Sequence, residues 1–279
     1  MKKMLPLNVL SVFDGISCGQ IALARAGITV AEYFASEIDE NAIRVTKARW
    51  PETVHLGNIK AFDVDALPPI DLMLGGMPCQ SHSVGGKRDG LQAETGKLLY
   101  DLVRIKNQVK PTYFLFECTY IPKKDLNTIN KLIGVEPIKL NSSLVSAQNR
   151  RRMYWTNIPQ TPIEDRGIKW NKWLYTLPHG GWKAEIKLFE KSPTVATHNP
   201  CRKYKVATQH TVVPEKLRDE NGHWHKHLKG SSPEDCEELQ TLPRGYTDVG
   251  ISKTARYKAI GNGWTVDLIV ELLRGLENA

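Results

Sequence analysis

The sequence contains no uninterrupted apolar run near the roughly 18 residues that a membrane-spanning helix needs. Two lysines lie near its start, but Pro6, Asn8 and Asp14 interrupt the apolar stretch that an export signal requires. Its five cysteines include no CxxC pair, which argues against a disulfide framework and against a structural zinc site. We therefore expect a soluble, cytoplasmic protein that has no membrane partner.

The composition is that of a folded, soluble chain. Of 279 residues, 41% are hydrophobic and 24% are charged, and no internal repeat or low-complexity tract is visible. This length predicts one large domain, or one domain that carries a smaller second one. The 38 Lys and Arg residues exceed the 30 Asp and Glu residues by eight, and this surplus favours an anionic partner, with nucleic acid first.

Short apolar runs alternate with helical patterns over the first 160 residues, which is typical of a mostly parallel, doubly wound α/β sheet. The expected strands cover residues 7–13, 31–36, 70–74, 113–116, 137–140 and 153–156. The expected helices cover residues 20–26, 39–50, 97–109 and 266–276.

The sequence changes character after residue 159. Residues 165–229 hold 13 Lys and Arg against 6 Asp and Glu, together with six of the eight histidines and four of the seven tryptophans. Apolar periodicity is weak there, so we expect a small basic domain with long loops. The predicted division is a catalytic and cofactor-binding domain at 1–158, a basic region at 159–245, and a C-terminal segment at 246–279 that returns to the first domain.

The first strand runs into a glycine-containing turn, Phe13-Asp14-Gly15-Ile16-Ser17-Cys18-Gly19. Glu37 follows 24 residues after Phe13, at the end of the next strand. An acidic residue near this offset accepts hydrogen bonds from ribose hydroxyls, which favours an adenosine-type cofactor. The glycines do not match GxGxxG, so an ordinary strand-to-helix turn is the alternative interpretation.

A second group of residues predicts chemistry at the carboxyl ends of other strands, where open α/β sheets bind ligands. Cys79, in Pro78-Cys79-Gln80, is placed to act as a nucleophile, although a buried filler is the common role of cysteine. Glu117 ends another strand and is a candidate proton donor. In an extended segment Gln148, Arg150 and Arg152 share one face, as anchors for a substrate or as a surface basic cluster.

These motifs, in this order, resemble those of the DNA cytosine-C5 methyltransferases. The resemblance spans nearly the whole chain and is similar in detail to the catalytic domain of de novo-type enzymes, in a compact form that suggests a solitary bacterial or phage relative. The matching segments are Phe13-Asp14-Gly15 to Gly19, Glu37, Gly57-Asn58-Ile59, Gly76-Met77-Pro78-Cys79-Gln80-Ser81, Glu117, Gln148-x-Arg150-x-Arg152, Gly245 to Val249, and Gly261-Asn262-Gly263-Trp264.

The resemblance implies an S-adenosylmethionine-dependent methyltransferase fold and a covalent mechanism on a flipped-out cytosine. Cys79 would add to C6, Glu117 would bond N3 and the exocyclic amine, Arg152 would hold O2, and Arg150 would order the nucleophile loop. The implied cofactor residues are Phe13, Asp14, Gly15, Ile16, Ser17, Gly19, Glu37, Ile38, Asn58, Ile59, Pro78, Leu99, Asn262, Gly263 and Trp264. The implied substrate residues are Gln80, Ser81 and Gln148, with Arg202, Lys203 and Lys205 as candidates because they cluster in the basic region, which would recognise the target.

Two positions depart from the family pattern. Cys118-Thr119 replaces the usual Asn-Val after Glu117, and Asn58 replaces the usual Asp. Two alternatives stay open. The same reaction on tRNA is one, because the family's tRNA-methylating branch has similar motifs. A catalytically inactive DNA-binding module of the same fold is the other, because the 118–119 pair is altered.

The expected partner is double-stranded DNA, with or without a restriction enzyme beside it, and we expect a monomer in a bacterial or phage-infected cell. We expect no metal, because the histidine-rich run 223–227 has no companion cysteine at ligand spacing.

Overall fold

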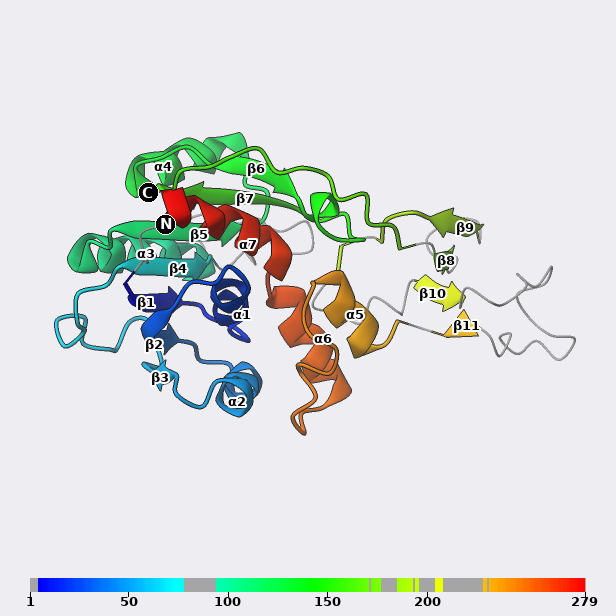
Figure 1. Ribbon diagram of the computed structural model, residues 1–279, viewed down its shortest axis with the longest axis horizontal. Helices are drawn as coiled ribbons and strands as arrows, with labels where there is room; N and C mark the ends of the chain where they lie inside the picture. Colours follow the sequence, from blue (N-terminus) through cyan, green and yellow to red (C-terminus); the bar gives the residue numbers. More distant parts are fainter. Residues whose placement is uncertain are drawn as a thin grey trace, which may run out of the picture.

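The structure is a computed structural model (Figure 1). It describes residues 5–77, 94–170, 172–176, 185–192, 194–195, 204–207, 228–229 and 231–278. Within this part of the chain, no helix combines the length and apolar character that crossing a membrane requires.

A seven-stranded sheet forms the centre of the protein, with strand order β3-β2-β1-β4-β5-β7-β6. Every neighbouring pair from β3 to β5 is parallel, whereas β7 runs antiparallel to both β5 and β6. Its strands are β1 (Leu7–Val12), β2 (Val30–Ser36), β3 (Val54–His55), β4 (Leu72–Gly76), β5 (Tyr113–Cys118), β6 (Ile138–Asn141) and β7 (Arg151–Thr156). The expected mostly parallel sheet is confirmed.

Helices cover both faces of this sheet, because successive side chains of its strands point to opposite sides. On β1, Val9 belongs to one hydrophobic core and Leu10 to the other, and Leu115 and Phe116 divide in the same way on β5. The helices on the first face are α1 (Cys18–Arg25), α2 (Glu40–Arg49) and α7 (Val266–Leu273). The helices on the second face are α3 (Glu94–Val109) and α4 (Lys123–Ile133).

Three α-helices that pack on the central domain were not predicted. Helix α4 follows β5, α5 (Pro233–Leu239) follows the basic region, and α6 (Lys253–Asn262) precedes α7. The Gly261-Asn262-Gly263 turn was expected to introduce the terminal helix, but it ends α6, with Gly263 as its C-cap. Helix α6 lacks an apolar stripe because Arg256 and Gly261 are buried in it beside Tyr257 and Ile260. The predicted helix 266–276 ends earlier as an α-helix and continues as a 3-10 helix at 274–278.

A four-stranded antiparallel sheet lies apart from the central sheet, within the basic region, with strand order β11-β10-β8-β9 (Figure 1). Its strands are β8 (Lys172–Thr176), β9 (Glu185–Phe189), β10 (Tyr204–Ala207) and β11 (Leu228–Lys229). Figure 1 places this sheet on the side toward which β1 and β4 point.

The chain returns to the central domain at about Ser231, before the expected boundary at residue 246. Helix α5 (Pro233–Leu239) begins with a capping box between Ser232 and Asp235. Its Cys236 and Leu239 are buried in the first hydrophobic core. Residues 231–245 therefore pack with the first domain rather than with the basic region.

Candidate active site

The strand order reverses at β1, because β2 lies on one side of it and β4 on the other, and such a switch point is where open α/β sheets bind ligands. Trp264 lies beside two glycines at this edge. A Cβ at Gly76 would stand 3.2 Å from Nε1 of Trp264, and a Cβ at Gly19 would stand 2.7 Å from Cδ1 of Leu74 and 2.9 Å from the hydroxyl of Tyr33. Only glycine at position 19 permits this close packing of α1 on the sheet.

The loop between β1 and α1 is held in an unusual backbone conformation. Phe13, Gly15 and Ser17 all have positive φ, at 55°, 61° and 55°, and two of them are not glycine. Such conformations persist only where the surroundings fix them, and they gather at functional sites. Glu37 helps to stabilise this backbone conformation, since its Oε2 accepts a hydrogen bond of 2.8 Å from the Gly15 amide.

The second oxygen of Glu37 binds its own strand end. Oε1 accepts from the amides of Ile38 (2.7 Å) and Asp39 (2.8 Å). The carboxylate that was expected to bind ribose is thus held at the mouth of the crevice between the first two strands, and Ile38 beside it is exposed.

Asp14 lies beneath the loop rather than in the crevice. Its carboxylate accepts hydrogen bonds from the hydroxyls of Ser17 and Tyr33, the latter at 2.8 Å. Burial raises the pKa of Asp14 to about 6, and hydrogen bonds from Ser11, Ser17 and Tyr33 oppose this rise only in part. The sequence did not single out Tyr33. The one available signal was a hydroxyl group within the predicted strand 31–36.

Asp14→Asn is expected to change how stability depends on pH. Because the folded pKa is raised from 3.8 to about 6, Asp14 contributes most to stability below pH 4, and this contribution is lost as the pH rises through 6. The free energy of unfolding of the variant, relative to wild type, should therefore rise by about 3 kcal/mol between pH 4 and pH 7. Urea unfolding at four pH values in this range measures the difference, and parallel profiles for the two proteins would contradict it.

Two of the residues expected to bind the cofactor lie on the second face of the sheet. Ile59 and Leu99 are both buried in the second hydrophobic core, and Arg104 of α3 donates to the Ile59 carbonyl (3.2 Å). Asn58 is exposed beside them, and its Oδ1 accepts from the Lys60 amide (3.0 Å). Its NH₂ group is therefore the donor that this side chain can present.

Glu117 and Arg152 form an ion pair at the carboxyl edge of the sheet, with 2.9 Å between Oε1 of Glu117 and Nε of Arg152. The antiparallel register of β5 and β7 brings them together, since Glu117 pairs with Tyr154 and alternate residues share a face. The Met77 amide donates to the Glu117 carbonyl (2.8 Å), so the segment that leads to Cys79 begins beside this pair. The structure thus brings together two of the residues that the sequence proposed as members of one site, and their catalytic roles stay predictions.

Gln148 was expected to contact the substrate, but it is fully buried and its amide binds protein groups. Its Nε2 donates to the Leu239 carbonyl (2.9 Å) and to Oε1 of Gln240 (3.1 Å), and its Oε1 accepts from the Val195 amide (2.7 Å). Gln240, which no sequence pattern indicated, donates in turn to the carbonyls of Ile260 and Gly263 (both 3.0 Å). Gln148 thus joins its own segment to those at Val195 and at Leu239–Gln240 by hydrogen bonds, and it does not reach the crevice.

Arg150 is also buried, at 3% exposure. Its guanidinium donates to the carbonyls of Val195 (3.0 Å), Gly261 (3.2 Å) and Gly263 (2.9 Å). It was expected to order the nucleophile loop as a catalytic residue. Its described contacts connect the base of the basic region with the turn that carries Trp264, because a buried guanidinium needs acceptors for its donors. Its role in ordering the nucleophile loop stays a prediction, since that loop lies outside the described residues.

Several expected site residues lie outside the described residues. These are Pro78, Cys79, Gln80, Ser81, Arg202, Lys203 and the histidine-rich run 223–227. Lys205 lies in β10, of which the backbone alone is described. In the remaining, described part of the chain, no group of three or more His, Cys, Asp or Glu side chains is arranged to hold a metal ion.

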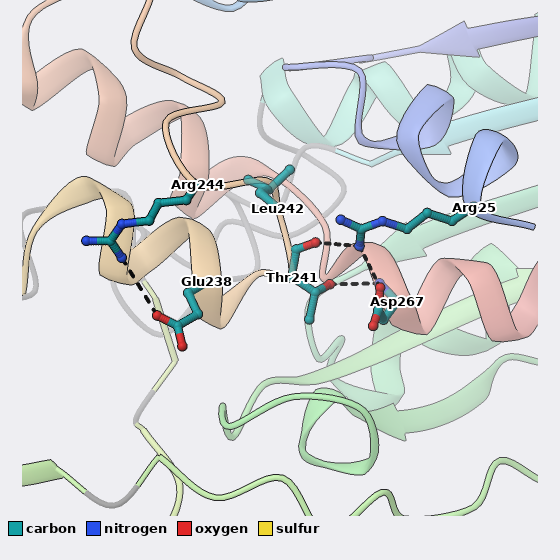
Figure 2. A pocket seen from close by; sticks show the side chains of 6 residues that line it. All are labelled: Arg25, Glu238, Thr241, Leu242, Arg244 and Asp267. Carbon is teal, nitrogen blue, oxygen red and sulfur yellow. Dashed lines mark hydrogen bonds and ion pairs between the residues drawn. The ribbon is translucent and has the colours of Figure 1, made fainter.

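A separate surface hollow of about 510 Å³ lies between α1, α5 and α7 (Figure 2). Its charged groups bind one another: Nη1 of Arg25 donates to the Thr241 carbonyl and to Oδ1 of Asp267, both at 2.6 Å. The Asp267 amide donates to the Thr241 hydroxyl (2.8 Å), and Arg244 faces Glu238 at 3.9 Å. These contacts join α1 to α7 and present no reactive group.

Comparison with known proteins assigns the chain to a family and identifies relatives of known name. The family model for C-5 cytosine-specific DNA methylase matches residues 7–158. Over 175 residues the chain is 33% identical to the orphan methyltransferase M.Rho11sI of Bacillus phage rho11s, which covers 58% of this chain and 35% of the phage protein. It is 24% identical to the type II methyltransferase M1.ScrFI of Lactococcus lactis subsp. cremoris, covering 96% of this chain and 77% of that protein. The chain thus spans about a third of the phage relative.

Solved structures share the fold. A methyltransferase of Entamoeba histolytica, EhMeth, superposes with a TM-score of 0.73 at 13% identity, over 99% of both chains. A DNMT2 variant of Spodoptera frugiperda superposes with a TM-score of 0.63 at 18% identity, over 97% of this chain and 99% of that one. The Rossmann-like methyltransferase fold expected from the sequence is confirmed.

Proposed function

Because the chain belongs to the C-5 cytosine-specific DNA methylase family, we propose that it methylates C5 of cytosine in double-stranded DNA, with S-adenosylmethionine as cofactor. The Glu117–Arg152 ion pair carries this proposal, because it lies at the carboxyl edge of the sheet, where the segment toward Cys79 also begins. The proposed site of activity is the cytoplasm of a bacterial or phage-infected cell, and the phage and bacterial relatives support it.

The residues at the switch point of the sheet fit such a cofactor. The glycines at positions 19 and 76 bring backbone close to the crevice, and Glu37 presents a fixed carboxylate at the end of β2. Glu37 would accept hydrogen bonds from the ribose hydroxyls, and Trp264 would bound the cofactor on the side of α7. When bound, S-adenosylmethionine supplies an electrophilic methyl group.

The protein's own part in the reaction is to make C5 of cytosine nucleophilic. The Cys79 thiolate would form a bond to C6, and the electron pair of the C5–C6 double bond would move into the ring and onto C5. Glu117 would hydrogen-bond N3 and the exocyclic amine, and Arg152 would orient both Glu117 and the base. C5 would then bond to the methyl carbon as the carbon–sulfur bond of the sulfonium breaks, and loss of the C5 proton would restore the double bond and expel the thiolate.

The small sheet of strands β8–β11 is the proposed target-recognition region. Its position on the carboxyl side of the central sheet supports this role, as does the excess of basic residues between positions 165 and 229. Phosphate contacts from such residues supply affinity, and a few side chains read base edges.

Bisulfite sequencing of plasmid DNA incubated with the protein and S-adenosylmethionine tests the proposed function. We expect protection of cytosines in one short sequence context. Parallel reactions on transfer RNA provide the alternative substrate. Cofactor binding without protection of either nucleic acid would reject catalysis and favour a binding module.

Cys118→Asn is expected to be tolerated. Cys118 is buried, and its thiol donates to the Met77 carbonyl at 3.8 Å, a contact that an asparagine NH₂ group can replace. Activity should remain within about threefold of wild type, because this change alters one hydrogen bond and removes no reacting group. A complete loss of turnover at an unchanged melting temperature would show that this pocket requires the cysteine.

A further inference from the structure

An aromatic and basic surface lies next to the Glu117–Arg152 pair and takes no part in the mechanism above. It consists of Tyr120, Lys123, Lys124 and Arg151, here called the basic rim. Tyr120 follows β5 three residues after Glu117 and is 62% exposed. The two lysines occupy the first turn of α4, and both are exposed, as is Arg151 at the start of β7.

The register of the sheet brings these residues together. Cys118, the last residue of β5, pairs with Met153 of β7. Tyr120 follows Cys118 by two residues, and Arg151 precedes Met153 by two, at the start of β7. Lys123 and Lys124 begin α4 just after Tyr120, so the rim lies where β5 ends and β7 begins, as the Glu117–Arg152 pair does.

Contacts with the described part of the chain do not explain the charges of the rim. Among the described residues, the side chains of Lys123, Lys124 and Arg151 form no ion pair or hydrogen bond, and Asp125 is the one acidic residue in the first turn of α4. Cations in the first turn of a helix oppose its macrodipole, so the two lysines do not stabilise α4. Three cations beside an exposed aromatic ring instead match a polyanion that also presents flat, apolar groups.

We propose that the basic rim binds the backbone of the DNA strand that carries the target cytosine. The lysines and Arg151 contact phosphates that flank the flipped nucleotide, and the Tyr120 ring packs on the adjoining sugar or base. This inference rests on the proposed DNA substrate, and it adds a contact surface on the central domain to the one expected from the small sheet.

The test is the salt dependence of DNA binding by the full chain, measured by fluorescence anisotropy with a duplex of arbitrary sequence. Lys123→Gln combined with Lys124→Gln should lower the slope of log Kd against log salt concentration by about 2 and weaken binding roughly tenfold, equally for all sequences. The matched control is Lys110→Gln with Lys131→Gln, which removes the same charge after α3 and in the last turn of α4. The control should lower the slope by less than about 0.5.

Three further measurements distinguish the loss of a DNA contact from a disturbed fold. Tyr120→Ala should weaken binding roughly tenfold while Tyr120→Phe retains it. The double lysine variant should raise the KM for DNA and leave the affinity for S-adenosylmethionine unchanged. Its melting temperature should equal or exceed that of wild type, because two unfavourable charges leave the helix start.

An unchanged slope in the double lysine variant, or an equal decrease in the control pair, would overturn the proposal. The proposed function can be rejected independently of this inference. If wild type binds DNA and the double lysine variant shows the expected decrease in slope, but wild type methylates no DNA, then the rim is a DNA-binding surface and the methylation proposal is rejected.

Discussion

Cys79→Ser is expected to reduce methyl transfer by at least about 10⁴-fold and to leave DNA binding largely intact. The proposed reaction depends on a covalent bond between a thiolate and C6, and a serine hydroxyl is far less nucleophilic at neutral pH than a thiolate. The measurement is single-turnover transfer of radiolabelled methyl groups to plasmid DNA, together with the Kd for the same DNA.

No cysteine among the described residues can replace Cys79. Cys18, Cys118 and Cys236 are all buried. Burial raises the pKa of the Cys18 thiol to about 12, so this thiol stays protonated and unreactive. The loss of activity in the variant should therefore be nearly complete.

A duplex containing 5-fluorocytosine provides the companion experiment. Wild type should form a complex with it that survives denaturant, because fluorine at C5 cannot leave as a proton does and elimination stops. Cys79→Ser should form none. If the serine variant kept most of its activity, the covalent mechanism would be rejected.

Glu237→Ala is expected to lower the free energy of unfolding by about 3–5 kcal/mol. Glu237 is fully buried, and its carboxylate accepts from the amides of Gly245 (2.6 Å) and Thr247 (2.8 Å) and from Nη2 of Arg256 (3.2 Å). Removing it leaves the two amides without this acceptor and takes one of two close carboxylates from the buried Arg256 guanidinium, which keeps Glu234 at 2.6 Å. Urea unfolding at pH 7.5 measures the change.

The neighbouring Glu238→Ala is the matched control. Glu238 is exposed and its nearest cation, on Arg244, is 3.9 Å away. Its loss should change the free energy of unfolding by less than about 0.5 kcal/mol. Similar effects of the two substitutions would show that Glu237 does not hold the 237–247 segment to α6.

Glu237 also shows why the return of the chain to the central domain was predicted too late. In the sequence it is one of several acidic residues between positions 234 and 238, and such a run is typical of a solvated helix face. Its burial depends on Arg256 and Thr247, which arrive from later segments of the chain. No local pattern encodes this arrangement.

The sequence by itself determined the parallel sheet, the positions of its main strands and the crevice at their carboxyl ends. Continuous apolar runs, glycine-containing turns and residues that end helices are signals in the local sequence. Because connections between parallel strands are right-handed, few strand orders are then compatible with these elements. It also proposed Glu117 and Arg152 for one site, and the register of β5 and β7 then brought the two side chains into contact. The ordered series of family motifs gave the proposed chemistry.

The tertiary structure alone decided which members of one motif reach the crevice. Gln148, Arg150 and Arg152 alternate along a single segment, and the sequence placed all three on one face. Packing of α5 and the Gly261–Trp264 turn buries the first two and turns their donors to backbone carbonyls, while Arg152 remains beside Glu117. The physical reason is that a side chain's role depends on what covers it, and the covering segments lie about 90 to 110 residues further along the chain.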